Sequence, residues 1–273
     1  MDDDRELLIG AVAYSANVVP IWEVILEYFS DGPAPMDFVL FSNYERQVEA
    51  LLAGHIDVAW NTNVAWVRTL RRTGGTATAL ASRDTDLVFT TVMVGRAGGG
   101  LQGLESLKGR RVALGSRDSG QARILPLHFL GRAGITPTDI DLLIFTSDVG
   151  KHADTGRSDL AAPRAVIDGD AAGAAIGVHT WDALRAGGDA ATADLEVIWE
   201  SEPYSHCNFT ALETLSEERY GPWLEHLMAM SWDDPDHRRI LELEGLTRWV
   251  PPQLEGYASL EAAMDEQHIS DRW

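Results

Sequence analysis

The chain has 273 residues, of which 45% are hydrophobic and 23% are charged, and its formal net charge at pH 7 is −20. This length allows one large or two medium domains, each with its own core, and the composition is that of a globular protein. The acidic charge argues against nucleic-acid binding, which needs a basic surface, and against docking on anionic membranes.

Neither export nor membrane insertion is expected from the sequence. No stretch reaches the roughly 18 apolar residues that a membrane span requires. Residues 1–6 are acidic and lead directly into an apolar run, without the basic region or apolar core of a signal peptide. The single cysteine, Cys207, cannot form an internal disulfide, which fits a reducing compartment. We therefore expect a cytoplasmic protein, and a periplasmic or extracellular one only if a signal peptide was removed.

The first third of the chain alternates predicted strands and helices. Its apolar runs are continuous, which is typical of strands buried on both faces of a parallel sheet. The strands are predicted at residues 7–13, 38–41, 56–60 and 76–81, and the helices at residues 18–29, 44–53 and 65–70. A β-branched run at residues 87–94 then predicts a strand that crosses into a second lobe.

The glycine-rich residues 95–100 predict a lobe boundary, after which a second α/β unit begins. Its strands are predicted at residues 111–114, 141–145, 171–178 and 195–199, and its helices at residues 121–132, 163–167 and 181–186. Residues 209–212 return the chain to the first lobe, and helices follow at residues 217–230 and 235–243. The prediction is an α/β protein with a discontinuous first lobe, residues 1–92 and 205–273, and a second lobe at residues 93–204.

Polar side chains follow several of these strands directly. In open α/β sheets, ligands bind beyond the carboxyl ends of the strands. Such side chains are therefore candidate ligand contacts: Tyr14, Ser42, Tyr44, Asn61, Asn63, Ser116, Asp118 and Ser119. The densest polar loop, residues 151–158, adds Lys151, His152, Asp154 and Thr155. Together they predict a site for a small polar ligand.

Three segments resemble the type 2 periplasmic-binding-protein family in its phosphate/phosphonate-binding branch: residues 44–59, 107–120 and 165–181. The resemblance implies two α/β lobes joined by crossing strands, with the ligand held in the cleft between the lobes. It implies that Ser116 and Ser119, at a helix N-terminus, hold the anion, and that Tyr14, Tyr44 and His152 assist. Free N–H groups at a helix start favour an anion. Arg117 and Asp118 stand where the family usually has small hydroxyl residues.

Cys207 is a candidate nucleophile, because a neighbouring imidazolium lowers the pKa of a thiol. His206 is adjacent in sequence, but neighbouring residues of a strand point to opposite faces. We therefore expect His152, rather than His206, to be the partner of Cys207. The alternative is a buried structural cysteine. No metal site is predicted, since the chain has no HxxxH, HxH or CxxC spacing.

Two functions follow from these features. The first is binding of a small anion, such as phosphate, a phosphonate or an organic carboxylate, as in importer components; an ABC permease is a partner only if the protein is exported. The second is a cytosolic, cofactor-free lyase, of the dehydratase or decarboxylase type, that uses His152, Cys207 and His206. No cofactor is expected for either function, and fold alone does not choose between them.

Overall fold

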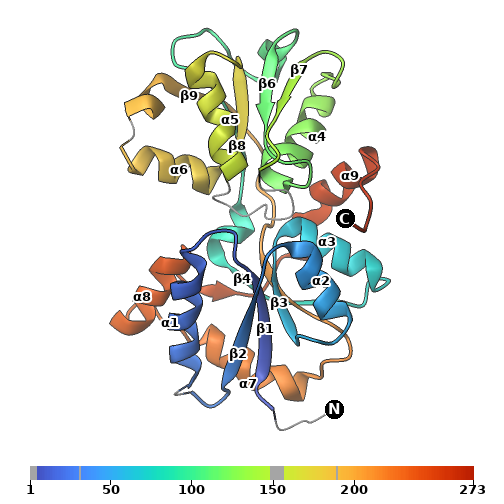
Figure 1. Cartoon of the computed structure of the whole chain (residues 1–273), viewed down its shortest axis with the longest axis vertical. Helices are drawn as coiled ribbons and strands as arrows, with labels where there is room; N and C mark the ends of the chain where they lie inside the picture. The colour runs from blue at the N-terminus through green and yellow to red at the C-terminus, as the bar shows by residue number, and fades with distance from the viewer. Residues whose placement is uncertain (1–4, 31, 148–156, 189) are drawn as a thin grey trace. The chain divides into compact units, whose positions relative to one another are not determined.

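The computed structural model describes residues 5–30, 32–147, 157–188 and 190–273 (Figure 1). The chain forms two compact units. Unit 1 consists of Met1–Val88, Ser205–Tyr257 and Ser270–Trp273, and unit 2 consists of Phe89–Tyr204 and Ala258–Ile269. The prediction of a two-lobed α/β fold is confirmed.

Unit 1 contains a six-stranded sheet in the order β11-β4-β10-β3-β1-β2. Its strands are β1 (Leu7–Val12), β2 (Met36–Phe41), β3 (Val58–Asn61), β4 (Thr78–Arg83), β10 (Asn208–Ala211) and β11 (Trp249–Val250). β1 pairs in parallel with β2 and β3, whereas β10 runs antiparallel to β3 and β4. The carboxyl ends of β1, β2 and β3 therefore lie at one edge of the sheet.

Helices cover both faces of this sheet (Figure 1). The helical segments of unit 1 are α1 (Val18–Ser30), α2 (Tyr44–Leu52), α3 (Asn63–Arg72), α7 (Glu217–Met228), α8 (Pro235–Glu244), and the 3₁₀ turns η1 (Asp84–Val88) and η5 (Leu254–Tyr257). Leu7 and Ile9 of β1 pack into the core with α1, α7 and α8, and Val12 packs on the opposite face with residues of α2 and α3. This two-sided burial explains the continuous apolar run of β1.

Unit 2 contains a five-stranded sheet in the order β7-β6-β8-β5-β9. Its strands are β5 (Thr91–Arg96), β6 (Arg111–Leu114), β7 (Asp141–Ile144), β8 (Gly173–Gly177) and β9 (Leu195–Glu200). Its helical segments are η2 (Leu104–Leu107), the π-helical turn η3 (Gly120–Ile124), α4 (Leu125–Arg132), α5 (Arg157–Asp168), α6 (Val178–Ala186), η4 (Ala190–Asp194) and α9 (Ala258–Glu266). β6 pairs in parallel with β7 and β8, so the carboxyl ends of these three strands share one edge.

The units begin and end at other residues than the lobes expected from the sequence. Unit 1 ends at Val88, and residues 95 and 96 still belong to β5. Gly95 packs inside the sheet, where a Cβ would lie 3.1 Å from Ile198 Cγ2. This glycine therefore permits close packing rather than marking a linker. The predicted strand at residues 87–94 is shorter, because residues 84–88 form η1.

The C-terminal helix α9 belongs to unit 2, although the sequence analysis placed residues 205–273 in the first lobe. α9 packs against α4, where His128 Nδ1 lies 2.7 Å from Glu266 Oε2. Gln267 Nε2 also donates to the carbonyl of Ile124 over 2.8 Å. These contacts join segments that are more than 100 residues apart, and helix periodicity alone does not reveal such a partner.

Candidate functional site

The polar residues that follow β1, β2 and β3 share one edge of the unit 1 sheet. Tyr14 follows β1 and is half-buried, and Ser42 follows β2 and is exposed. Tyr44 begins α2 and is 3% exposed. Asn61 ends β3, Asn63 begins α3, and both side chains are fully buried. The parallel strands thus bring these predicted residues to the same edge.

The amide of Asn61 takes part in a buried chain of hydrogen bonds. Its Oδ1 accepts from Gln47 Nε2 over 2.8 Å, and its Nδ2 donates to Thr210 Oγ1 over 3.0 Å. Thr210 then donates to Asn208 Oδ1, and Asn208 Nδ2 donates to the Tyr257 hydroxyl. Burial raises the pKa of Tyr257 well above its ordinary value, so this phenol stays protonated. Asn61 therefore has a structural role whether or not it contacts a ligand.

Asn63 differs from Asn61 because one of its amide atoms has no protein partner. Asn63 Oδ1 accepts from the backbone N–H of Val64 over 2.8 Å. Its Nδ2 is buried and makes no hydrogen bond to any described residue. Buried polar atoms in native proteins are nearly always hydrogen-bonded, so this N–H₂ group is a candidate donor to a ligand.

In unit 2, Ser116 and Ser119 lie between β6 and the turn η3. Ser119 Oγ accepts from the Ala122 N–H over 3.2 Å and so caps η3, and its own proton remains available to an acceptor. Ser116 is fully buried, and its Oγ has no hydrogen-bond partner within the described part of the chain. The predicted serines therefore come together at the start of a helical segment, where backbone N–H groups favour an anion.

Thr180 adds a second unpaired hydroxyl at this edge, and the sequence analysis missed it. The residue lies in the first turn of α6, directly after β8, and is 1% exposed. Its Oγ1 also lacks a partner among the described residues. Because β6 and β8 are parallel neighbours, Ser116 and Thr180 follow strands that end at the same edge. The strand-end argument applied to Ser116 would have selected Thr180 as well.

Residues 116–123 contain two arginines, Arg117 and Arg123, and one aspartate, Asp118, and the buried Asp159, which accepts from Gln121, brings the local formal charge to zero. Burial and then the like charge of Arg117 lower the pKa of Arg123, and the carboxylate of Asp118 acts in the opposite direction. Arg123 lies in η3 and was not selected from the sequence. The guanidinium groups offset the negative charge of Asp118, which is 3% exposed. The surroundings of these serines are therefore locally neutral, although the chain as a whole is acidic.

The predicted residues Lys151, His152, Asp154 and Thr155 lie outside the described residues.

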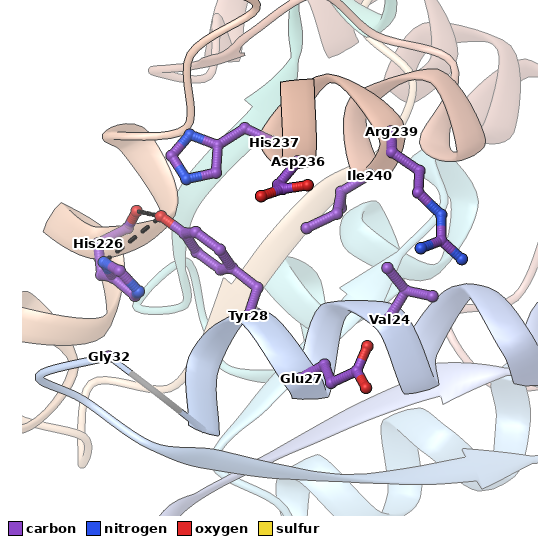
Figure 2. A pocket seen from close by; sticks show the side chains of 9 residues that line it. All are labelled: Val24, Glu27, Tyr28, Gly32, His226, Asp236, His237, Arg239 and Ile240. Atoms are coloured by element: carbon purple, nitrogen blue, oxygen red, sulfur yellow. Dashed lines mark hydrogen bonds between the residues drawn. The ribbon is translucent and has the colours of Figure 1, made fainter. Parts of the chain in front are cut away.

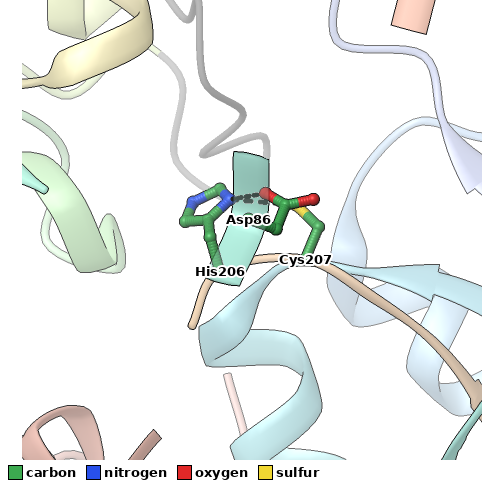
Figure 3. Close-up of side chains that lie close together, drawn as sticks. All are labelled: Asp86, His206 and Cys207. Atoms are coloured by element: carbon green, nitrogen blue, oxygen red, sulfur yellow. Dashed lines mark hydrogen bonds and ion pairs between the residues drawn. The ribbon is translucent and has the colours of Figure 1, made fainter. Parts of the chain in front are cut away.

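Cys207 and His206 approach one another in unit 1, contrary to the expectation from strand alternation. Cys207 Sγ lies 3.0 Å from His206 Nδ1, and His206 Nδ1 lies 3.4 Å from Asp86 Oδ1 (Figure 3). The expectation fails because β10 begins only at Asn208, so both residues precede the strand. Asp86 comes from η1 and was missed, because a single aspartate in a turn gives no sequence pattern.

Asp86 is held in its ionised form within this buried cluster. Arg83 donates from Nε to Asp86 Oδ2 over 2.6 Å and from Nη2 to Oδ1 over 3.0 Å. Burial opposes ionisation, but the charge of Arg83 and the hydrogen bonds from His206 and Arg83 outweigh it and lower the pKa of Asp86. One ring nitrogen of His206 faces both the thiol and the carboxylate. A nucleophile–base–acid relay needs both ring nitrogens, so the geometry does not reproduce such a triad.

A surface pocket of about 520 Å³ lies between α1 and α8 of unit 1 (Figure 2). Tyr28 stacks on His226 with ring centroids 4.3 Å apart, and His237 meets the Tyr28 ring edge-on at 5.1 Å. The Tyr28 hydroxyl donates to the His226 carbonyl over 2.9 Å. The aromatic side chains of this pocket thus pack against one another. None of its lining residues follows a strand end, where this type of fold places its ligand contacts.

The sequence matches, over residues 11–257, a family described as the periplasmic substrate-binding protein of phosphonate ABC transporters. The chain belongs to this family. A curated relative, the probable ABC transporter phosphite binding protein PhnD1 of Prochlorococcus marinus (strain MIT 9301), is 24% identical over 230 residues, which are 80% of this chain and 74% of that protein.

Solved structures of similar fold support the two-lobed α/β architecture. PhnD1 from Prochlorococcus marinus in complex with methylphosphonate has a TM-score of 0.77 and 20% identity, covering 96% of this chain and 98% of that chain. XAC2383 from Xanthomonas citri, bound to ATP, has a TM-score of 0.74 and 17% identity, covering 97% of this chain and 99% of that chain.

Family membership confirms the predicted fold and the prediction of a small-anion-binding component of an ABC transporter. It also corrects two expectations. The predicted cytoplasmic location is wrong, because the proteins of this family are periplasmic. The lyase alternative is not supported by any of the relatives. Among the described residues, no helix is both long and apolar enough to cross a membrane.

Proposed function

We propose that the protein captures a phosphonate or phosphite anion for an ABC importer, whose permease is then its partner. In this proposal Ser116, Ser119 and Thr180 of unit 2 donate hydrogen bonds to the anion. The observation that carries it is the fully buried Ser116 Oγ, which has no partner in the described structure and lies beside the start of η3. The names of the relatives, which refer to phosphite and methylphosphonate, support the ligand class.

Hydroxyl and backbone N–H donors suit an oxyanion because each gives one short, charge-assisted hydrogen bond. Such bonds contribute about 1.5–3 kcal/mol each, which is more than bonds between neutral groups. Two or three of them, with the N–H groups at a helix start, suffice for a small ligand of four or five heavy atoms.

Asp118 gives this site a means to prefer phosphonates over sulfonates. A phosphonate near neutral pH exists partly as a monoanion that carries one P–O–H group, and the Asp118 carboxylate is able to accept that proton in a hydrogen bond. A sulfonate has no such proton, so its oxygens meet the carboxylate with repulsion. A buried carboxylate therefore favours a ligand that carries an acidic proton, such as a phosphonate monoanion, over one that does not, such as a sulfonate.

The proposal also includes the other ligand contacts that the sequence predicts in the two units. In unit 1 the strongest is Asn63, whose buried Nδ2 has no partner among the described residues. The other proposed contacts are Tyr14, Ser42, Tyr44, Asn61, Lys151, His152, Asp154 and Thr155.

The test is thermal unfolding with phosphite, methylphosphonate, phosphate, sulfate and ATP at equal ionic strength. A ligand at 100 times its Kd stabilises the folded state by about 2.7 kcal/mol. For a protein of this size, that corresponds to a rise in Tm of about 5–10 °C. We expect the largest rise with phosphite or methylphosphonate, and little with sulfate. A flat response to all five would refute anion binding, and a rise with ATP alone would replace the small anion by a nucleotide.

A further inference from the structure

The buried cluster of Asp86, His206 and Cys207 is not part of the proposed anion site, and its three side chains are of types that bind transition metals (Figure 3). We propose that this cluster binds a divalent metal ion of borderline softness, such as Zn²⁺. The three residues come from two segments of unit 1 that are far apart in sequence, so the fold has to bring them together.

The spacing of the donor atoms is close to that of a tetrahedral zinc site. One donor atom from each residue lies within 4.8 Å of the other two. With metal–ligand distances of about 2.3 Å to sulfur and about 2.1 Å to nitrogen or oxygen, tetrahedral angles separate N from O by about 3.4 Å and S from N by about 3.6 Å. The distance from His206 Nδ1 to Asp86 Oδ1 is 3.4 Å, and that from Cys207 Sγ to His206 Nδ1 is 3.0 Å. The Sγ–Nδ1 distance is thus about 0.6 Å shorter than the tetrahedral value, and the Nδ1–Oδ1 distance matches it.

The donor set also indicates which metal is bound. Thiolate and imidazole ligands favour Zn²⁺ and similar ions, whereas Mg²⁺ and Ca²⁺ take oxygen ligands. The thiol loses its proton as the metal–sulfur bond forms, so binding one Zn²⁺ releases one proton to the solvent without any oxidation or reduction. Three protein ligands leave the fourth position to a water molecule.

Burial and a neighbouring arginine prepare the cluster for a metal. Asp86 and His206 are fully buried and Cys207 is 4% exposed, so charges there require partners or a metal. Arg83 donates two hydrogen bonds to the Asp86 carboxylate, as an outer residue does when it orients a metal ligand. With Cys207 as a thiolate, the charges of Asp86, Cys207 and Arg83 sum to −1. A divalent ion therefore leaves the buried group with a charge of only +1.

The same residues form a satisfied group without metal if His206 Nδ1–H donates to the Asp86 carboxylate, which Arg83 also neutralises. The two arrangements differ in stability and in spectroscopy. Asp86 lies two residues before the first segment of unit 1 ends at Val88, and His206 is the second residue after the chain returns at Ser205. A metal would link these two segments, and unit 1 should then resist unfolding.

The test uses the reduced, metal-stripped, full-length protein without an affinity tag, titrated with Co²⁺ and then with Zn²⁺. We expect one equivalent of Co²⁺ to give an intense near-ultraviolet thiolate-to-metal band together with visible bands typical of tetrahedral cobalt. Zn²⁺ should displace the cobalt, release about one proton per ion in calorimetry and raise the Tm. Absence of the thiolate band from the folded wild-type protein overturns the proposal without any variant.

Variants then identify the ligands. Cys207→Ser should abolish the thiolate band and weaken Zn²⁺ binding at least about 100-fold, since even outer residues of metal sites contribute about 10- to 100-fold. His237→Asn alters a histidine of the pocket between α1 and α8 and should leave the band and the affinity unchanged. Zn²⁺ binding that survives Cys207→Ser, or that is lost in His237→Asn, refutes the proposed site.

Discussion

Removing the Ser116 hydroxyl tests whether this side chain contacts the ligand or stabilises the folded protein. Ser116 is fully buried, and its Oγ makes no hydrogen bond to the residues described in the structure. Ser116→Ala therefore removes no protein hydrogen bond and relieves an unsatisfied buried group. The free energy of unfolding without ligand should stay the same or rise by up to about 1 kcal/mol.

Ligand affinity should respond in the opposite direction. A charge-assisted hydrogen bond from a hydroxyl to an oxyanion contributes about 1.5–3 kcal/mol, so the Kd for phosphite or methylphosphonate should rise about 10- to 150-fold. Isothermal titration calorimetry measures the affinity, and thermal unfolding with and without ligand measures the stability. A higher Kd together with unchanged or higher stability of the free protein would identify Ser116 as a ligand contact.

Two other serines of unit 2 provide matched controls. Ser119→Ala removes the acceptor that caps η3, so it should lower stability by about 1 kcal/mol as well as weaken binding. Ser106 precedes β6, and its Oγ donates to the Gly103 carbonyl over 2.7 Å, so Ser106→Ala should leave the affinity unchanged. If Ser116→Ala instead destabilises the free protein by more than 1 kcal/mol and leaves the Kd unchanged, Ser116 is structural and our reasoning about the site is wrong.

Three further predictions test neighbouring parts of the structure. Thr180→Val should weaken anion binding by about 1–3 kcal/mol with little loss of stability, as measured by calorimetry and unfolding; unchanged affinity would remove Thr180 from the site. Asp118→Asn should narrow the preference for methylphosphonate over methanesulfonate, because the carboxylate no longer repels the sulfonate, and an unaltered ratio of the two Kd values would contradict this role. Arg83→Gln should destabilise the protein by about 3–5 kcal/mol in denaturant unfolding, because it removes the cation that neutralises the buried Asp86 and leaves only His206 beside it. The lowered pKa of Asp86 means that its contribution is present above the unfolded-state pKa and is lost as pH falls through the folded-state pKa. Wild-type stability should therefore fall below about pH 4, and the variant should lose less over the same range.

Most strands of the two sheets could be predicted because their burial is visible in the sequence, whereas the two-residue edge strand β11 could not. β1 is covered on both faces, so nearly every residue is apolar, and β6 at Arg111–Leu114 was predicted with its observed bounds. The serines after β6 were predicted by the same logic, since a strand end fixes which side chains reach the edge of the sheet. The resemblance of the segment around them to a known family added the anion.

The cluster around Cys207 could not be predicted, because it depends on where a strand starts. The alternation rule separates His206 from Cys207 only if both lie in β10, and the strand begins one residue later. Asp86 joins them through a turn, and no sequence motif indicates that Arg123 is partly buried and close enough to Arg117 for their charges to interact. The predicted cytoplasmic location is wrong because the proteins of the matched family are periplasmic.

An anion-binding protein with a net charge of −20 is physically consistent if the charge and the donors act over different distances. At physiological ionic strength, charges separated by more than about 8 Å of solvent are largely screened, so most surface carboxylates contribute little to the energy of a bound anion. Buried hydroxyl and N–H donors act at contact distance, and the low local dielectric strengthens their hydrogen bonds. The surface charge thus maintains solubility, while recognition depends on a few fixed donors. This separation explains how uncharged residues such as Ser116 and Thr180 can bind an anion in a chain that has 42 acidic residues.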